Sequence, residues 1–194
     1  MKAAVITFPG SNCDRDLAVA LQNAGAQVTR VWHKDQDLPE GTDLVGVPGG
    51  FSFGDYLRCG AIAAHSPIAA ALRRHAERGG YLLGICNGFQ VLTELGLLPG
   101  ALMRNSALTF ICKPATLNVL TTDSAFTAGY RKGQQIGIPV AHHDGNYQIT
   151  PDGLARLQDG DRIAFTYGPA INGSVGDIAG ILSENRRVLG MMPH

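Results

Sequence analysis

The first half of the chain alternates short apolar runs with helical segments, and this alternation limits the fold more than any other feature. Residues 2–8, 26–32 and 43–47 have the length and composition of buried strands, and a fourth run ends at Cys86. Parallel strands joined by helices need helices on both faces of the sheet. We therefore predict an α/β fold with a mostly parallel central sheet flanked by helices.

The predicted helices lie between these strands. Ser11 or Asn12 can cap the first helix, and Gly25 can end it. An Ala-rich helical stretch covers residues 60–78 and is broken or restarted at Pro67. In sheets of this kind ligands bind at the carboxyl ends of the strands, so we look for chemistry there.

The second half of the chain has short strand-like runs separated by turns, and Asn172-Gly173 is a turn signal between two of them. This pattern is typical of mixed or antiparallel strands added to the first sheet. No linker, repeat or charge block divides the chain, so we predict a single domain over residues 1–194, apparently truncated at its C-terminus. The runs cover residues 110–112, 115–120, 135–140, 162–167, 178–182 and 188–192.

Composition excludes several function classes. The formal net charge is zero, which argues against nucleic acid or an anionic membrane surface as a partner. No apolar run reaches membrane-spanning length, and the N-terminus lacks a signal-peptide layout. Four cysteines without a Cys-x-x-Cys pair indicate neither a metal site nor a disulfide framework. We expect a cytoplasmic protein.

Cys86 is the strongest chemical candidate. It lies in Gly84-Ile85-Cys86-Asn87-Gly88, between an apolar run and a helical segment. Strand, tight turn with a nucleophile and helix form a nucleophile elbow, and the start of a helix favours a thiolate. The alternative is that Cys86 is an inert, buried side chain, as most cysteines are. That alternative is our expectation for Cys13, Cys59 and Cys112.

A second glycine-rich segment, Pro48-Gly49-Gly50-Phe51, follows the third predicted strand. In elbow enzymes an oxyanion is held by the amide after the nucleophile and by an amide of a nearby loop. Here these would be the amides of Asn87 and of Gly50 or Phe51. By itself the segment could also be no more than a tight loop.

Histidine is the usual acid–base partner of a cysteine nucleophile. His194 directly follows the last apolar run and is therefore well placed at a strand end. His142 and His143 follow another strand and could line a site or decorate a turn. The others carry less signal: His33, His65 and His75.

Longer sequence strings show a family resemblance. Gly-Ile-Cys-Asn-Gly-Phe-Gln at residues 84–90 and Met-Met-Pro-His at residues 191–194 resemble the class I, triad-type glutamine amidotransferases. Further strings, at residues 9–14, 48–61 and 171–174, resemble one group within them, the glutaminase subunits of phosphoribosylformylglycinamidine synthase. The resemblance covers essentially the whole chain, and PGGFSFGDYLRCGA is its most specific string.

This resemblance implies a reaction. Cys86 would attack the side-chain amide of L-glutamine, with the oxyanion on the amides of the Gly50 region and Asn87. His194 would activate the thiol and protonate the departing ammonia, and water would hydrolyse the thioester to glutamate. Gln90 would help to position glutamine. The full set of implied substrate contacts is Gly49, Gln90, His142, Asn146 and Tyr147.

The resemblance also implies partners. Ammonia would pass to a large synthetase subunit, which would use ATP and Mg²⁺ to make the amidine of formylglycinamide ribonucleotide in purine biosynthesis. A small accessory subunit is a further candidate. We expect no cofactor in this chain, because it has no phosphate-cradling Gly-x-x-x-x-Gly-Lys-Ser/Thr motif. The implied interface residues are Asp55, Tyr56 and Arg58.

One departure bears on catalysis. The family pattern continues His-Pro-Glu, and the Glu orients the histidine, whereas the sequence stops at His194. We expect a truncated chain, and a tail containing Pro-Glu should raise its activity. Two alternatives stay open: a non-catalytic regulatory scaffold of the synthetase, which the missing Glu motivates, and another elbow-type cysteine hydrolase without ammonia transfer. Gln90 and His194 argue against the latter.

Overall fold

A computed structural model describes residues 1–55 and 59–194. The predicted interface residues Tyr56 and Arg58, and the side chain of Asp55, lie outside this description. The chain divides into two compact units, Met1–Leu97 and Leu98–His194, which we describe separately. The prediction of one domain over the whole chain stays a prediction.

The N-terminal unit contains four strands and the helices between them. Its elements are β1 (Lys2–Thr7), α1 (Asp14–Asn23), β2 (Gln27–Trp32), β3 (Leu44–Val47), the short 3-10 helix η1 (Ser52–Asp55), α2 (Cys59–Ala64), α3 (Ile68–Glu77), β4 (Tyr81–Ile85) and α4 (Asn87–Glu94). The strands follow the order β2-β1-β3-β4 and all pair in parallel. The predicted parallel sheet is therefore confirmed.

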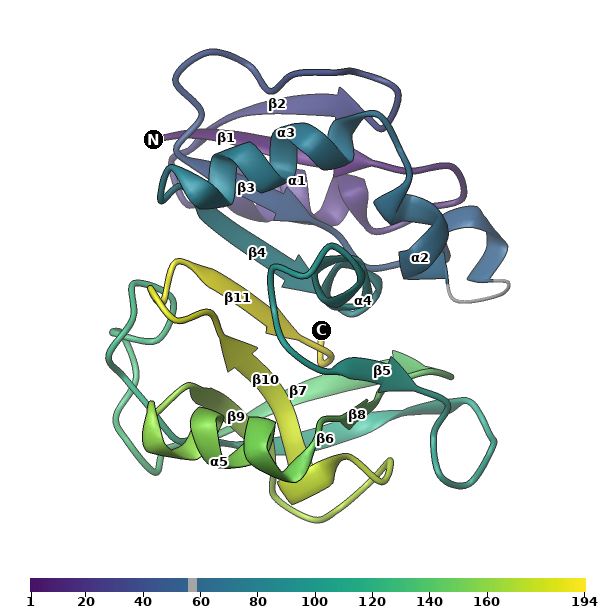
Figure 1. The fold of residues 1–194 in the computed structure, drawn as a ribbon, viewed down its shortest axis with the longest axis vertical. Coiled ribbons are helices and arrows are strands. Elements are labelled where there is room, and N and C mark those ends of the chain that lie inside the picture. The colour runs from purple at the N-terminus through teal and green to yellow at the C-terminus, as the bar shows by residue number, and fades with distance from the viewer. Residues whose placement is uncertain (56–58) are drawn as a thin grey trace. The chain divides into compact units, whose positions relative to one another are not determined.

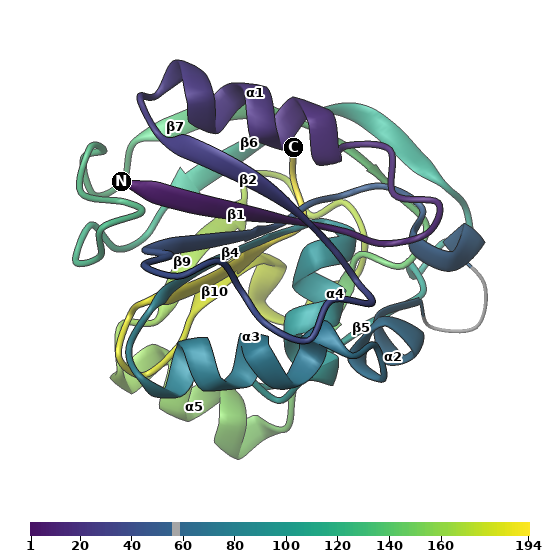
Figure 2. The ribbon, with the colours of Figure 1, turned by 90° about the horizontal axis from the view of Figure 1, so that it is seen from above.

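Helices cover both faces of these parallel strands, with α1 on one face and α3 on the other (Figures 1 and 2). Val5 of β1 packs with Leu17 of α1 in a buried cluster. Gly46 of β3 lies under Leu17, because a β-carbon there would come within 2.7 Å of the leucine Cδ2 atom. This close approach explains why a glycine occupies the middle of a buried strand.

The predicted cap of α1 is wrong. Its N-cap is Cys13, whose side chain makes no capping hydrogen bond. The reason is that both predicted capping residues face another segment. The hydroxyl of Ser11 donates to the carbonyl oxygen of Gly49 at 3.4 Å, and the side-chain oxygen of Asn12 lies against Gly50.

The C-terminal unit is built from antiparallel strands, as predicted. Its strands are β5 (Ala101–Met103), β6 (Ile111–Val119), β7 (Gln135–His142), β8 (Asn146–Gln148), β9 (Ile163–Tyr167), β10 (Ile178–Leu182) and β11 (Val188–Met191). The sheet order is β11-β10-β9-β6-β7, with antiparallel pairing throughout, and β5 pairs with β8 in a separate two-stranded sheet.

Two predictions about this unit need correction. The two runs predicted at residues 110–112 and 115–120 are one strand, β6 (Ile111–Val119), which continues through Pro114. Pro114 lies opposite Pro139 of β7. Antiparallel strands alternate hydrogen-bonded and non-hydrogen-bonded pairs, and two prolines, which lack N–H groups, can occupy a non-hydrogen-bonded pair. A helix, α5 (Pro151–Asp159), was not predicted, although Thr150 caps it by accepting from Gly153 N.

No helix among residues 1–55 and 59–194 is long and apolar enough to cross a membrane.

Candidate active site

Cys86 occupies the predicted elbow between β4 and α4. Its backbone has φ 51° and ψ −108°, a conformation that residues other than glycine rarely adopt. Such strain costs about 1–3 kcal/mol and persists only where the surrounding structure enforces it. The residue is the N-cap of α4, and its carbonyl accepts from Phe89 N at 2.9 Å. The Cys86 thiol therefore lies at the positive end of a helix, which favours a thiolate.

The two flanking glycines make the elbow possible. A β-carbon on Gly84 would lie 2.7 Å from the carbonyl oxygen of Gly88 and 2.5 Å from Leu92 Cδ1. A β-carbon on Gly88 would collide with the carbonyl oxygen of Val47. Both positions therefore exclude side chains.

The predicted oxyanion loop follows β3, next to the elbow in the sheet. In the parallel pairing of β3 with β4, Val47 lies opposite Gly84. The segment after β3 and the nucleophile after β4 therefore leave the sheet at the same edge. Gly50 has φ 120°, which only glycine adopts without strain. Phe51 is 43% exposed, so its side chain takes no part in the core.

Asn87 and Gln90 face each other on the first turn of α4. Asn87 Nδ2 donates to Gln90 Oε1 at 2.7 Å. Asn87 is buried, whereas Gln90 is half-buried. This bond fixes the orientation of the Gln90 side-chain amide. The N-terminal unit thus brings together six predicted site residues: Gly49, Gly50, Phe51, Cys86, Asn87 and Gln90.

The C-terminal unit holds the predicted histidines. His194 follows β11, and its backbone N–H donates to the carbonyl oxygen of Pro139 at 2.9 Å. His142 ends β7, the strand that contains Pro139. Burial lowers the pKa of His142, and the charge of the nearby His194 lowers it further.

The ring of His142 is fixed by Asn105. Asn105 Nδ2 donates to the carbonyl oxygens of Thr109 and His142, both at 2.9 Å, so Asn105 Oδ1 must be the acceptor facing the ring. His142 Nδ1 lies 3.1 Å from that oxygen and therefore carries the proton. Burial lowers the pKa of His142 to about 4, so the ring is neutral at neutral pH. Among the described residues, its Nε2 atom has no hydrogen-bond partner and is buried.

Asn146 and Tyr147 differ in what they can offer a substrate. The Tyr147 side chain is fully buried, and its hydroxyl donates to the carbonyl oxygen of Pro99 at 2.8 Å. Burial also raises the pKa of Tyr147 well above its ordinary value. The predicted contact from Tyr147 is thereby limited to its backbone. Asn146 is half-buried and donates to the carbonyl oxygen of Arg104 at 3.2 Å.

Sequence reasoning missed the polar network behind these residues. Asn172 Nδ2 donates to the carbonyl oxygen of Gly145 at 2.7 Å, and Ser174 Oγ donates to Asn172 Oδ1 at 2.8 Å. Ser174 Oγ in turn accepts from Tyr147 N at 3.0 Å. Asn172 was recognised only as part of a turn signal and of a family string, with no role assigned to its side chain, and nothing in the sequence marked Asn105. The network fixes the backbone of the segment that follows β7.

The other cysteines are not uniformly buried, which corrects an expectation. Cys13 is half-buried and Cys112 is exposed, and neither they nor Cys86 form a disulfide. Burial raises the pKa of the Cys13 thiol, and Asp16 and Asp14 raise it further. Cys13 is therefore a poor nucleophile at neutral pH. Within the described ranges, no cluster of three or more His, Cys, Asp or Glu side chains could hold a metal ion.

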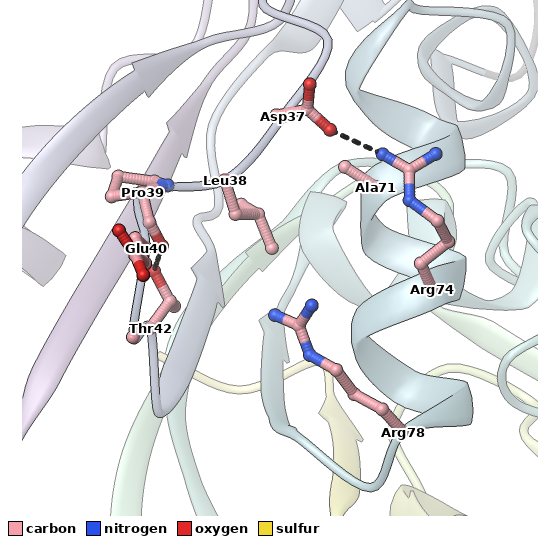
Figure 3. Close-up of a pocket in the computed structure, with 9 residues that line it drawn as sticks. Asp37, Leu38, Pro39, Glu40, Thr42, Ala71, Arg74 and Arg78 are labelled. Carbon is pink, nitrogen blue, oxygen red and sulfur yellow. Dashed lines mark hydrogen bonds and ion pairs between the residues drawn. The ribbon is translucent and has the colours of Figure 1, made fainter.

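A pocket of about 280 Å³ in the N-terminal unit lies apart from the predicted site residues (Figure 3). The loop at residues 37–42 and the α3 residues Ala71, Arg74 and Arg78 line it. Arg74 points at Asp37, and their nitrogen and oxygen atoms are 2.7 Å apart. The two side chains are 54% and 82% exposed, so this ion pair contributes at most about 1 kcal/mol.

Comparison with known proteins identifies the family. The sequence profile of the CobB/CobQ-like glutamine amidotransferase domain matches residues 1–194. Phosphoribosylformylglycinamidine synthase subunit PurQ of Cereibacter sphaeroides is 74% identical over 194 residues, covering all of this chain and 87% of that protein. The same subunit of Roseobacter denitrificans is 70% identical with the same coverage.

A solved structure agrees with these sequences. A chain in the structure of PurLQS from Thermotoga maritima superposes with a TM-score of 0.91 and 44% identity, covering all of this chain and 86% of that one. The family profile, the sequence identity and the fold therefore all indicate the same family. The chain belongs to the CobB/CobQ-like glutamine amidotransferases and, within them, to the PurQ glutaminase subunits of phosphoribosylformylglycinamidine synthase.

Proposed function

We propose that the chain hydrolyses L-glutamine to glutamate and ammonia through a thioester on Cys86. His194 takes the proton of the Cys86 thiol, the thiolate attacks the side-chain carbonyl carbon, and the carbonyl electrons move onto the oxygen. The tetrahedral intermediate collapses as His194 gives a proton to the nitrogen, and the C–N bond breaks to release ammonia. Water, deprotonated by His194, then attacks the thioester, and the thiolate leaves with glutamate as the product.

The observation that carries this proposal is the strained backbone of Cys86 beside the glycine loop of β3. A φ of 51° at a buried cysteine needs a reason, and a nucleophile elbow supplies one. The amides of Asn87 and of Gly50 or Phe51 are the candidate oxyanion donors. One such donor contributes a factor of about 10²–10³ in rate.

Further residues would bind the rest of glutamine. The side-chain amide of Gln90 and the backbone of Gly49 suit the carboxylate and carbonyl oxygens of an amino acid. From the C-terminal unit we assign contacts to Asn146 and to the backbone of Tyr147. The ring of His142 is buried, so its role would be to shape the site and not to carry charge.

Ammonia is most useful if it never equilibrates with water, where it becomes ammonium and loses its nucleophilic lone pair. We propose that the chain passes it to a synthetase subunit that binds ATP and Mg²⁺. The relative from Thermotoga maritima, which was solved as PurLQS, supports such an assembly. Asp55, Tyr56 and Arg58 stay the proposed contacts, and the exposed Phe51 and Ile62 flank them in the sequence. The site of action would be the cytoplasm.

The test is covalent labelling by a glutamine-derived chloroketone, followed by mass spectrometry. We expect one adduct, on Cys86, that excess glutamine suppresses. Cys13 and Cys112 serve as internal controls, because they are less buried than Cys86 yet should stay unmodified. The Cys86→Ala variant should gain no adduct. Labelling without protection by glutamine would favour another cysteine hydrolase, and absence of labelling in the assembled complex would favour a scaffold.

A further inference from the structure

The turn between β1 and α1, residues 9–13, lies directly against the proposed oxyanion loop, residues 49–53. The backbone N–H of Phe53 donates to the carbonyl oxygen of Pro9 at 2.6 Å. A β-carbon on Gly10 would lie 2.6 Å from the carbonyl oxygen of Phe51. These two contacts join the turn to the far end of the loop, backbone against backbone.

Ser11 holds the near end of the loop. Its hydroxyl donates to the carbonyl oxygen of Gly49 at 3.4 Å. In a planar trans peptide, the C=O of one residue and the N–H of the next point in opposite directions. A donor that holds the Gly49 carbonyl therefore also directs the Gly50 N–H away from the turn. Gly50 N–H is one of the candidate oxyanion donors.

Asn12 supports the next position. A β-carbon on Gly50 would lie 2.5 Å from Asn12 Oδ1 and 2.7 Å from Asn12 N. Asn12 thus occupies the space that a side chain at position 50 would need. Gly50 has a φ of 120°, and because it has no side chain, the neighbouring peptide planes can rotate unless contacts fix them. Asn12 is such a contact.

The start of α1 supports the same conclusion. Serine and asparagine are strong N-capping residues, yet the cap position is Cys13, whose side chain makes no capping hydrogen bond. Ser11 and Asn12 are directed at the loop instead. The helix forgoes a local stabilising bond, and the loop gains two contacts.

We propose that Ser11 and Asn12 are positioning residues that fix the Gly49–Gly50 peptide so that the Gly50 N–H can serve the oxyanion. This role rests on the proposed function and extends it to a segment outside the elbow and the glycine loop. Neither residue touches the reacting atoms. Their effect should therefore appear in the chemical step and not in the binding of glutamine.

The test compares Ser11→Ala and Asn12→Ala with wild type, each assembled with the synthetase subunits. Ser11→Thr keeps the hydroxyl and should rescue activity. Ser183→Ala removes a hydroxyl that donates to Asn185 Oδ1 in the β10–β11 hairpin, and it controls for loss of a serine. We expect kcat for glutamine hydrolysis to fall about tenfold in Ser11→Ala, less than the loss of a whole oxyanion donor, with KM changed less than about twofold.

A second readout separates positioning from structure. Alkylation of Cys86 by iodoacetamide needs no oxyanion donor, so its rate should be the same in Ser11→Ala and wild type, and the melting temperature should not change. Unchanged kcat in Ser11→Ala with an active wild type would overturn this inference alone. Parallel losses of kcat, iodoacetamide reactivity and melting temperature would also overturn it, in favour of simple packing. An inactive wild-type complex would overturn the proposed function itself.

Discussion

Gly88 of α4 lies directly on the carbonyl oxygen of Val47 at the end of β3, where a side chain would collide with it. This contact places the first turn of α4 over the strand that leads into the glycine loop. Because Val47 also lies opposite Gly84 in the sheet, three backbone segments meet around Cys86. The nucleophile is thus positioned by backbone packing.

Gly88→Ala should therefore destabilise the protein and inactivate it. The added methyl group meets backbone, which cannot rotate away, so we expect a loss of roughly 3 kcal/mol in the free energy of unfolding. Urea titration followed by circular dichroism measures this loss. Gly129→Ala is the matched control, because nothing lies within 4 Å of a β-carbon there. Equal stabilities of the two variants would show that the elbow has room to relax.

Cys86→Gly and Cys86→Ala should both abolish glutamine hydrolysis but differ in stability. Glycine adopts a φ of 51° without strain, whereas alanine retains the strain of the wild type. We expect Cys86→Gly to be more stable than Cys86→Ala by about 1 kcal/mol. Thermal unfolding of the two variants provides the comparison. A less stable glycine variant would mean that the backbone at Cys86 is not strained.

Acid should destabilise the protein through His142. Its pKa is about 4 when folded, below the ordinary value of 6.5, so the unfolded state binds more protons between these values. Stability is therefore highest above about pH 6.5 and falls as the pH drops toward 4, by up to about 3 kcal/mol for this group. Burial also lowers the pKa of His33 and His75, which act in the same direction.

The contribution of His142 can be isolated by His142→Gln. Urea unfolding at pH 7, 5.5 and 4.5 should show a shallower loss of stability in this variant than in wild type. His65→Gln, at an exposed histidine, controls for the removal of a histidine. A pH dependence in His142→Gln as steep as that of wild type would contradict the assignment.

Asn172→Ala should disturb the segment that follows β7. The change removes the donor to the Gly145 carbonyl and the acceptor of Ser174 N and Oγ, and of these bonds only the weaker one from Ser174 Oγ to the Gly145 carbonyl at 3.3 Å stays, so we expect a loss of roughly 2 kcal/mol. Because Gly145 precedes Asn146 and Tyr147, we also expect a higher KM for glutamine. Steady-state kinetics and urea unfolding check both effects. Asn23→Ala, at an exposed position of α1, should change neither quantity.

The Arg74–Asp37 pair in the pocket of Figure 3 should matter little. Both side chains are more than half exposed, so water and salt screen the attraction. Arg74→Ala should lower the free energy of unfolding by less than about 1 kcal/mol, and glutamine hydrolysis should be unaffected. A loss of activity in this variant would point to a function for the pocket.

Features that depend on residues close together in the chain could be predicted from the sequence. The elbow is one, because a strand, two glycines around Cys86 and a helix lie within a few positions of each other. The parallel strands of the first half are another, since apolar runs alternating with helices can be buried in few ways. The glycine loop was placed correctly because it follows a strand, and parallel strands end at one edge.

Features that depend on residues far apart in the chain could not be predicted from the sequence and are seen only in the folded structure. Ser11 and Asn12 were predicted to cap a helix. In the structure they instead contact Gly49 and Gly50, which lie far away in the sequence. Asn105 fixes the ring of His142 across 37 positions, with no local signal for either partner. Short polar side chains bond whichever backbone group folding brings near, and a linear pattern does not record which group that is.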